Sequence, residues 1–352
     1  MDGKVLVIGD WDADGVVSAA MIVYVQEKLG AYPFKGRVNV DIEPAGPRSI
    51  GEVLYQTSGC WEYVVIVDIP FTSEVESFLS EYRSRGCRGA IFYFDHHPST
   101  IENATSIEEK YGVTVVTGRS ATSVLLLRYL EGMGIKLSGR LRSYATAVAH
   151  LEGRRWREAG SVDEKLVSLV ASISKTLNVL RDREVWRKYV KWMASPLPLE
   201  PPKIKIEGEK EELLRKGLEL SKEADEEAKR AAMELAFSAV NLGYAKLVDA
   251  RGKWRKRGAS ALASWLYKII GQTIVLLVER HDGVPLVIIR SNGGVAKRTA
   301  EKLLARGLVE DVGGHGNLAI SRLPRDFDLE KLKEHLRRAL LEAYQESRGN
   351  IF

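Results

Sequence analysis

The sequence predicts an α/β protein, because short apolar runs alternate with longer helical segments in its first half. Residues 4–8 (KVLVI) are typical of a buried strand, and the apolar segment 16–29 that follows has the length of a helix. Residues 63–67 and 89–94 repeat the pattern of a short buried strand. Strands separated by helices form parallel sheets, so we expect a parallel sheet here.

Acidic residues follow the first of these strands at every second position. Asp10, Asp12 and Asp14 stand in the sequence GDWDADG at residues 9–15, at a predicted strand-to-helix turn. Open α/β sheets bind ligands at the carboxyl ends of their strands. Three crowded carboxylates repel one another unless cations neutralise them, and Mg²⁺ and Mn²⁺ are the oxygen-preferring candidates. A solvated acidic turn is the plainer alternative, but the cluster does not stand alone.

The next two predicted strands also end in metal-ligand residues. Asp68 follows residues 63–67, and Asp95-His96-His97 follows residues 89–94. Each aspartate taken singly could be an ordinary helix cap. Because the carboxyl ends of parallel strands lie side by side, these residues can converge, and together they suit a two-metal site for phosphoester hydrolysis. Imidazole ligands favour Mn²⁺ over Mg²⁺.

These three motifs resemble the signature of the DHH phosphoesterase superfamily, in the form found in RecJ-like exonucleases. The resemblance implies that two ions, Mn²⁺ or Mg²⁺, activate a water for in-line attack on a phosphodiester. Five of the metal ligands that it implies are Asp10, Asp12, Asp14, Asp68 and His96. It also assigns catalysis to Asp12, His96 and His97, with His97 contacting the scissile phosphate.

One position departs from the pattern of the family, which has a further metal-binding aspartate after a helix that follows the DHH motif. The best local match is residues 144–153 (YATAVAHLEG), and it places His150 where the aspartate is expected. We expect His150 to be a metal ligand, because imidazole can replace a carboxylate. Two alternatives remain: the site has lost a metal or its activity, or Glu152 serves instead.

The resemblance extends to the carboxyl-terminal half. Residues 289–291 (IRS) and 313–317 (GGHGN) resemble the DHH-associated domain, in which an arginine and a Gly-Gly-His loop hold the substrate. Arg290 would bind phosphate as a bidentate fork, and the glycines would permit close approach of the substrate backbone. The substrate-binding residues that the resemblance implies are His97, Arg290, Ser291, Gly313, Gly314, His315 and Gly316.

The order of predicted elements gives the domain boundaries. Residues 120–130 read as a helix, and residues 196–202 (PLPLEPP) are too rich in proline for a helix or a central strand. A charged, helix-rich stretch follows at 207–240. Strands are predicted at 244–248, 273–278 and 286–289, with a hairpin at Asp282-Gly283. We therefore expect a parallel-sheet DHH domain (1–195), a helical linker (196–241) and a smaller α/β DHH-associated domain (242–352), with cutting in the cleft between the domains.

The composition of a basic segment predicts that this protein binds single-stranded nucleic acid. Residues 251–257 (RGKWRKR) place five cations around one tryptophan, and the net charge of the chain is +5. Bases can stack on Trp254 while Lys253 and Arg255 follow the phosphates of a single strand. The alternative is a solvated basic loop.

Composition adds limits on location and redox state. The chain has 352 residues, enough for two domains, and we find no uncharged apolar run of 18 residues or more. We expect a soluble, cytoplasmic protein that does not enter membranes. In that compartment Cys60 and Cys87 should be small buried hydrophobic residues without a disulfide.

We predict a metal-dependent exonuclease that degrades single-stranded DNA or RNA. One alternative is a phosphatase of small substrates or a phosphodiesterase of oligonucleotides or cyclic dinucleotides. The other is an inactive replication or repair subunit. The partner classes left open are single-stranded nucleic acid, a replication or repair protein, and a second copy of the chain.

Overall fold

A computed structural model describes residues 4–56, 59–152, 162–195, 209–254, 258–280 and 282–349. The chain divides into two compact units, Met1–Leu220 and Ser221–Phe352.

The first unit is built on a five-stranded sheet in which every neighbouring pair of strands is parallel. The strands are β1 (Val5–Gly9), β2 (Val40–Pro44), β3 (Tyr63–Val67), β4 (Ala90–Asp95) and β5 (Val113–Thr117). Their order in the sheet is β2-β1-β3-β4-β5. The three strands predicted from the first half of the sequence therefore form the middle of the sheet, and the parallel sheet is confirmed.

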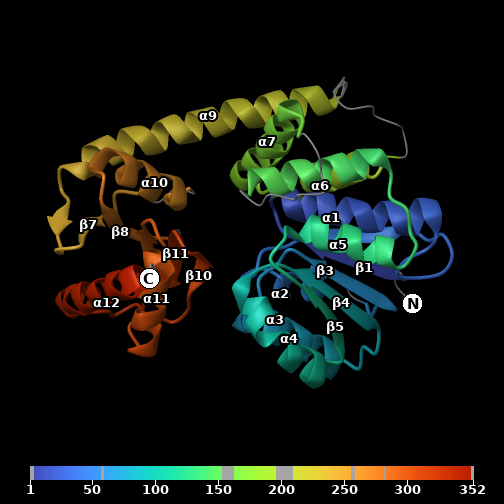
Figure 1. Ribbon diagram of the computed structural model, residues 1–352, viewed down its shortest axis with the longest axis horizontal. Coiled ribbons are helices and arrows are strands. Elements are labelled where there is room, and N and C mark those ends of the chain that lie inside the picture. The colour runs from blue at the N-terminus through green and yellow to red at the C-terminus, as the bar shows by residue number, and fades with distance from the viewer. Residues whose placement is uncertain are drawn as a thin grey trace. The chain divides into compact units, whose positions relative to one another are not determined.

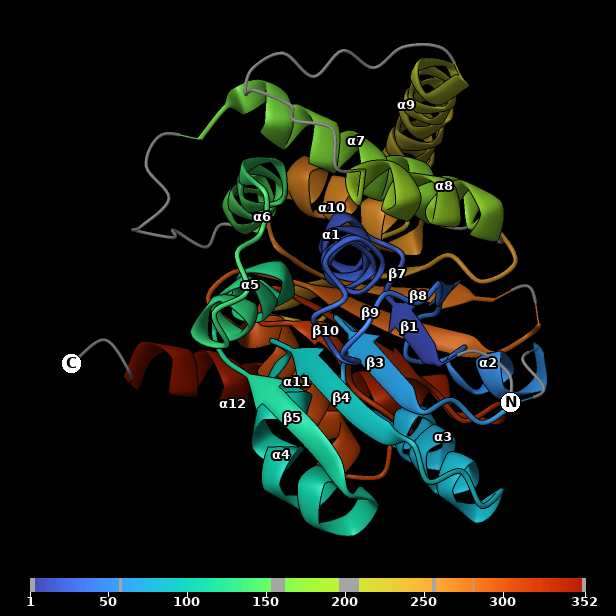
Figure 2. The ribbon, with the colours of Figure 1, turned by 90° about the vertical axis from the view of Figure 1, so that its right-hand side faces the viewer.

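Helices cover both faces of this sheet, as Figure 2 shows. The helices are α1 (Ala13–Val23), α2 (Gly51–Gln56), α3 (Ser73–Ser84), α4 (Pro98–Tyr111), α5 (Thr122–Gly132), α6 (Gly139–Leu151), α7 (Glu164–Leu180) and α8 (Arg183–Met193). One core packs the sheet against α1, α5, α6, α7 and α8, and the other packs it against α2, α3 and α4. The predicted helix at 16–29 is α1 continued by one π-helical segment, η1 (Tyr24–Leu29).

The second unit contains a mixed sheet of six strands. The strands are β6 (Val240–Asn241), β7 (Ala245–Asp249), β8 (Thr273–Glu279), β9 (Pro285–Arg290), β10 (Gly313–His315) and β11 (Leu318–Arg322), and their order is β10-β11-β9-β8-β7-β6. The helices are α9 (Glu209–Ala236), which begins in the first unit, α10 (Ala259–Ile270), α11 (Val295–Ala305) and α12 (Leu329–Gly349). In Figure 1 α11 and α12 lie on one face of this sheet and α10 on the other.

The sequence-based strands of this half are confirmed to within one or two residues. β8 and β9 are antiparallel neighbours, so the hairpin expected at Asp282-Gly283 is confirmed as well. The proline-rich segment 196–202 lies outside the described residues. The domain boundaries proposed at 195 and 241 remain predictions.

The cysteines contradict the sequence analysis, because Cys60 and Cys87 form a disulfide. They lie just before β3 and β4, at the amino ends of two adjacent parallel strands, so their α-carbons are 5.2 Å apart. The expectation of two unpaired thiols came from the assumed compartment and not from the residues themselves.

We expect this disulfide to stabilise the first unit, because it closes a loop between residues 27 apart in sequence. Replacing both cysteines with serine should lower the free energy of unfolding by about 2–4 kcal/mol, mainly because the unfolded chain gains conformational entropy without the cross-link. Thermal unfolding of the double variant, with and without reductant, measures this. A reductant effect that persists in the double variant would show that the loss has another cause.

Candidate metal centre and phosphate-binding loop

The carboxyl ends of three adjacent strands bring the predicted metal ligands together. Gly9 of β1 pairs with Val67 of β3, which pairs with Phe94 of β4. The next residue on each strand is an aspartate. The backbone N–H of Asp68 donates to the Phe94 carbonyl at 2.9 Å, so the alignment continues one residue past the strand end. The sheet order therefore sets Asp10, Asp68 and Asp95 side by side. Asp10 and Asp12 belong to neither of the close groups of ligand atoms found among the described residues.

The acidic loop between β1 and α1 is held by its own backbone geometry. Asp12 caps α1, because its Oδ1 accepts hydrogen bonds from the backbone N–H groups of Asp14 and Gly15. Position 15 must be glycine, because a Cβ there would lie 2.4 Å from the Asp10 carbonyl oxygen. The Asp12 cap leaves Oδ2 of the same carboxylate unused by the helix.

Two helices that come much later in the chain fix the same loop. Trp186 of α8 is fully buried, and its indole Nε1 donates to the Asp10 carbonyl at 2.9 Å. Ser174 of α7 accepts from the backbone N–H of Ala13 at 2.8 Å. Sequence reasoning missed both residues, since no local pattern connects positions about 160 or more apart.

The start of α5 orients two of the buried carboxylates. Asp14 accepts from the backbone N–H groups of Thr122 and Ser123, at 2.7 and 2.8 Å. The Thr122 hydroxyl donates to Asp68 Oδ1 at 2.8 Å. Asp68 also has φ 62°, a left-handed backbone that is uncommon outside glycine and concentrates at functional sites.

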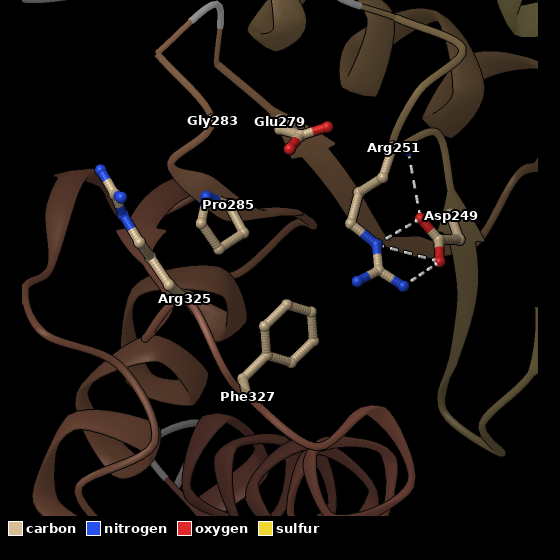
Figure 3. Close-up of a pocket in the computed structure, with 7 residues that line it drawn as sticks. All are labelled: Asp249, Arg251, Glu279, Gly283, Pro285, Arg325 and Phe327. Atoms are coloured by element: carbon tan, nitrogen blue, oxygen red, sulfur yellow. Dashed lines mark hydrogen bonds and ion pairs between the residues drawn. The ribbon is translucent and has the colours of Figure 1, made fainter.

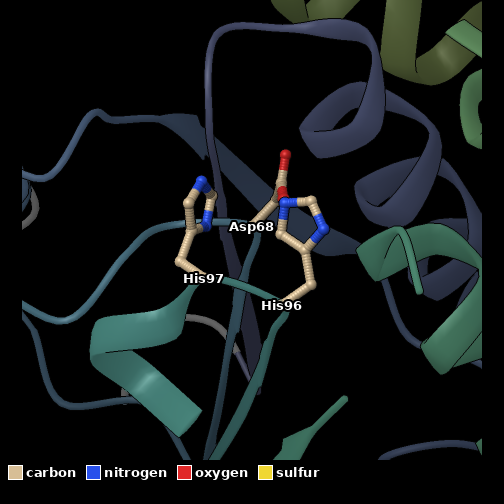
Figure 4. A group of neighbouring side chains, drawn as sticks. All are labelled: Asp68, His96 and His97. Atoms are coloured by element: carbon tan, nitrogen blue, oxygen red, sulfur yellow. The ribbon is translucent and has the colours of Figure 1, made fainter. Parts of the chain in front are cut away.

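Two groups of ligand atoms share His96. In each group the candidate ligand atoms lie within 4.8 Å of one another, a spacing that one ion could span. The first is Asp68, His96 and His97, drawn in Figure 4, and the second is Asp14, His96 and Glu152. His96 Nε2 lies 3.6 Å from Asp68 Oδ1, and His96 Nδ1 lies 3.4 Å from Glu152 Oε2. Carboxylate oxygens with imidazole nitrogens are a donor set that fits Mn²⁺.

The structure contradicts the prediction for His150. Its side chain is exposed and belongs to neither group, whereas Glu152 contacts His96. Residues two apart on a helix point about 200° apart, so only one of the two can face the sheet. The side that α6 turns inward carries Ala145, Ala149 and, at its carboxyl cap, Glu152. The alternative in which Glu152 serves is the one that the geometry favours.

His97 is held by Asp95, the first residue of the DHH motif. His97 Nδ1 lies 2.7 Å from Asp95 Oδ1, and the other Asp95 oxygen accepts from the His97 backbone and from Thr100. Burial alone would lower the pKa of His97, but the Asp95 charge and hydrogen bond raise it to about 9. Burial likewise opposes ionisation of Asp95, and the His97 charge outweighs it, so the pKa of Asp95 is lowered. At neutral pH the pair is therefore an imidazolium on a carboxylate.

Three carboxylates of the cluster, those of Asp10, Asp14 and Asp68, hold protons unusually well in the metal-free protein. Burial, followed by repulsion from Asp12, raises the pKa of Asp10 to about 7 and that of Asp14 to about 6. Burial and the charges of Asp14 and Asp12 raise the pKa of Asp68 well above its usual range. Such a site gains most from a divalent cation, which removes the repulsion.

We expect metal binding to be weaker at low pH for this reason. The folded-state pKa values of Asp10 and Asp14 lie above the unfolded values, so these groups destabilise the metal-free fold as pH rises from about 4 to 7. Mn²⁺ should therefore raise the melting temperature more at pH 8 than at pH 5.5. Thermal unfolding across that range, with Mn²⁺ or chelator, measures this. An equal increase at both pH values would contradict it.

The second unit brings together the other predicted substrate residues. Arg290 ends β9, and its Nη1 donates to the Asn317 carbonyl at 3.2 Å, while the Ser291 backbone N–H donates to the same carbonyl at 3.0 Å. The Asn317 side chain accepts from the Gly294 backbone N–H at 3.3 Å. Asn317 therefore joins the end of β9 to the start of α11, and the amino terminus of a helix is suited to binding anions. Sequence reasoning missed this role of Asn317.

The Gly-Gly-His segment forms β10 and pairs with β11. At Gly314, φ is 100° and a Cβ would lie 2.2 Å from the Leu318 carbonyl oxygen, so only glycine fits. Gly316 accepts from the backbone N–H of Lys297 in the first turn of α11, which places the loop beside that helix. Gly313 and His315 belong to β10 by their backbone, and the His315 side chain lies outside the described part of the chain.

The basic loop does not present its tryptophan as expected. Trp254 is only 6% exposed and packs in a core with residues of α9 and α10, so little of its ring is open to a base. This burial speaks against the prediction for Trp254, because the ring supplies apolar area to the core of the unit. Lys253 is exposed, and Arg255 lies outside the described residues.

Comparison with known proteins supports the fold. No protein-family model matches the sequence, and no curated protein matches it. Solved structures do match. RecJ of Thermus thermophilus in complex with Mn²⁺ is 17% identical over 97% of this chain and 52% of its own, with a TM-score of 0.60.

Two further structures cover more of their own length. A DHH domain from a protein described as a member of a family of ribosomal proteins is 16% identical, covers 97% of this chain and 86% of its own, and has a TM-score of 0.61. An exonuclease RecJ bound to manganese is 17% identical over 97% and 90% of the two chains, with a TM-score of 0.55. This chain spans about half the length of the Thermus protein.

Among the described helices, none combines the length and apolarity needed to cross a bilayer.

Proposed function

We propose that this chain, which has the RecJ-like fold of the DHH superfamily, is a metal-dependent phosphodiesterase that degrades single-stranded DNA or RNA from an end. The observation that carries the proposal is the cluster of carboxylates around His96: Asp14 of α1, Asp68 at the end of β3 and Glu152 at the carboxyl cap of α6. This cluster is more than a motif match, because residues far apart in sequence supply it.

The residues that would hold metal are Asp10, Asp12, Asp14, Asp68, His96 and Glu152. Two bound Mn²⁺ or Mg²⁺ ions would supply an activated water and stabilise charge on the attacking and leaving oxygens. Hydrogen bonds from other residues of the chain hold these ligands in position. Thr122 and Ser123 orient the carboxylates of Asp14 and Asp68, and Trp186 fixes the loop that carries Asp10 and Asp12.

His97 would bind the scissile phosphate. Asp95 occupies its Nδ1 at 2.7 Å and keeps the ring charged at neutral pH, so Nε2–H is available to a phosphate oxygen. Hydrogen bonds with an ionised partner are about twice as strong as those between two neutral groups. Arg290, the glycines at 313, 314 and 316 and the start of α11 would hold a second phosphate of the substrate.

Degradation of end-labelled single strands tests this proposal. In Mn²⁺, product should accumulate from one end of the strand, and excess chelator should stop the reaction. Strands labelled at the 5′ or 3′ end reveal the polarity, and matched DNA and RNA strands reveal the preferred polymer. Undiminished hydrolysis in chelator would contradict a metal mechanism.

One observation favours a second candidate, a phosphodiesterase of dinucleotides or cyclic dinucleotides. Burial of Trp254 removes the aromatic surface on which the long-strand prediction rested. Turnover of a dinucleotide that exceeds that of a long single strand at equal concentration would favour this candidate. The inactive-subunit alternative is less favoured, because Glu152 lies beside His96 and would serve in place of His150.

A further inference from the structure

A pocket in the second unit lies outside both sites described so far. It has a volume of about 280 Å³. Figure 3 shows its lining residues around the open space: Asp249, Arg251, Glu279, Gly283, Pro285, Arg325 and Phe327. We call it the Phe327 pocket. Ligand pockets start at about 300 Å³, so it has room for one flat ring system and not for a large molecule.

The Phe327 pocket and Arg290 lie at opposite ends of one strand. Pro285 begins β9 and Arg290 ends it. Five residues of antiparallel strand separate their α-carbons by about 17 Å. The pocket is therefore distinct from the phosphate-binding loop at residues 313–316.

Arg251, the first residue of the basic loop, is fixed at the pocket wall. Its Nε and Nη2 donate to the Asp249 carboxylate, with the shortest contact at 2.6 Å, and its guanidinium carbon lies 5.0 Å from the centre of the Phe327 ring. Within the described residues, Arg251 Nη1 makes no hydrogen bond. The carboxylate thus offsets the desolvation cost of the cation and leaves the N–H groups of Nη1 available to a ligand.

Two further charged side chains line the pocket, and the charge of one of them, Glu279, acts on Arg251. Glu279 is half-buried at the end of β8, and Arg325 is exposed in the segment before α12. In the described part of the second unit, neither side chain makes a hydrogen bond or an ion pair. The pocket therefore offers one carboxylate acceptor, two guanidinium donors, and the apolar surfaces of Pro285 and Phe327.

We propose that the Phe327 pocket binds one unpaired guanine base of a single strand. Guanine presents N–H donors along one edge, which a carboxylate accepts, and the acceptors O6 and N7 along the other, which arginine recognises. Unstacked bases bind on aromatic rings and on guanidinium planes. Adenine has an acceptor at N1, where guanine has a donor, so Glu279 would repel it. This inference rests on the proposed single-strand substrate and moves base recognition from Trp254 to Phe327.

Binding in excess chelator tests the pocket without hydrolysis. The probe is a fluorescently labelled strand of adenines, with or without one central guanine, followed by fluorescence anisotropy. One guanine should tighten binding roughly tenfold, the effect of one discriminating base contact. Equal affinity of the parent protein for the two strands would overturn the proposal.

Substitutions at the lining residues test whether the guanine preference arises in the Phe327 pocket. Glu279→Gln should abolish the guanine preference, whereas Glu334→Gln, at an exposed position on α12, should retain it. Arg325→Gln should weaken the preference, with Arg338→Gln as its matched control. Phe327→Leu, which keeps an apolar side chain beside the core, should weaken binding of the guanine-containing strand and leave binding of the all-adenine strand unchanged. A preference that survives in Glu279→Gln would exclude this pocket.

Competition with free nucleotides tests which base the pocket recognises. Guanosine monophosphate should displace the guanine strand and adenosine monophosphate should not; displacement by both at equal concentration would contradict the pocket chemistry. A guanine preference without hydrolysis in Mn²⁺ would refute only the proposed function. Hydrolysis without the preference would refute only this inference.

Discussion

Asp68→Asn should reduce hydrolysis by at least the roughly 10- to 100-fold that is typical when a residue supporting a metal ligand is lost. Asp68 is buried, contacts His96 and accepts a hydrogen bond from Thr122. Asparagine keeps the shape and an acceptor oxygen but removes the charge that an ion needs. The same variant should raise the melting temperature of the metal-free protein at pH 8, because burial and neighbouring carboxylates oppose ionisation of Asp68.

These two opposite effects separate a metal ligand from a structural residue. Activity assays and thermal unfolding with and without Mn²⁺ measure them. Asp41→Asn is the matched control, since Asp41 is an exposed aspartate of the same sheet whose bond from Trp61 an asparagine can still accept. A variant that loses both activity and metal-free stability would instead assign Asp68 a structural role.

Glu152→Ala should weaken Mn²⁺ binding and hydrolysis by about 10- to 100-fold or more, whereas His150→Ala should change each by less than about twofold. Glu152 lies against His96, and His150 is exposed on another side of α6. Titration of Mn²⁺ against activity and against melting temperature measures both variants. Because the two positions are two residues apart on one helix, each is the control for the other. The reverse ranking would restore the assignment of His150 and show that α6 is rotated in the active protein.

The strand ends could be predicted because two local signals suffice. A short apolar run identifies each strand, and parallel pairing sets their carboxyl ends side by side, so Asp10, Asp68 and His96 had to converge once the order was β1-β3-β4. The hairpin before β9 was equally local, since Asp282-Gly283 is a strong turn signal. Neither prediction required knowledge of which helix packs where.

The errors concern side-chain direction and contacts between distant segments. Alignment places His150 beside Glu152 in sequence, but only the rotation of α6 against the sheet selects Glu152. Trp254 reads as a stacking residue among cations, and the core formed with α9 and α10 buries it instead. The disulfide depends on the adjacency of β3 and β4, which the spacing of Cys60 and Cys87 does not reveal.

The bonds from Ser174 and Trp186 to the acidic loop also bear on the order in which the site is completed during synthesis. The loop emerges from the ribosome first, but its hydrogen-bond partners lie 161 and 176 residues further along the chain. At typical translation rates this delay is roughly 8 to 35 seconds. A nascent chain that ends before Trp186 carries all the aspartates of the loop and lacks the helix that fixes them. The acidic loop therefore reaches its hydrogen-bonded form late, after most of the first unit has left the ribosome.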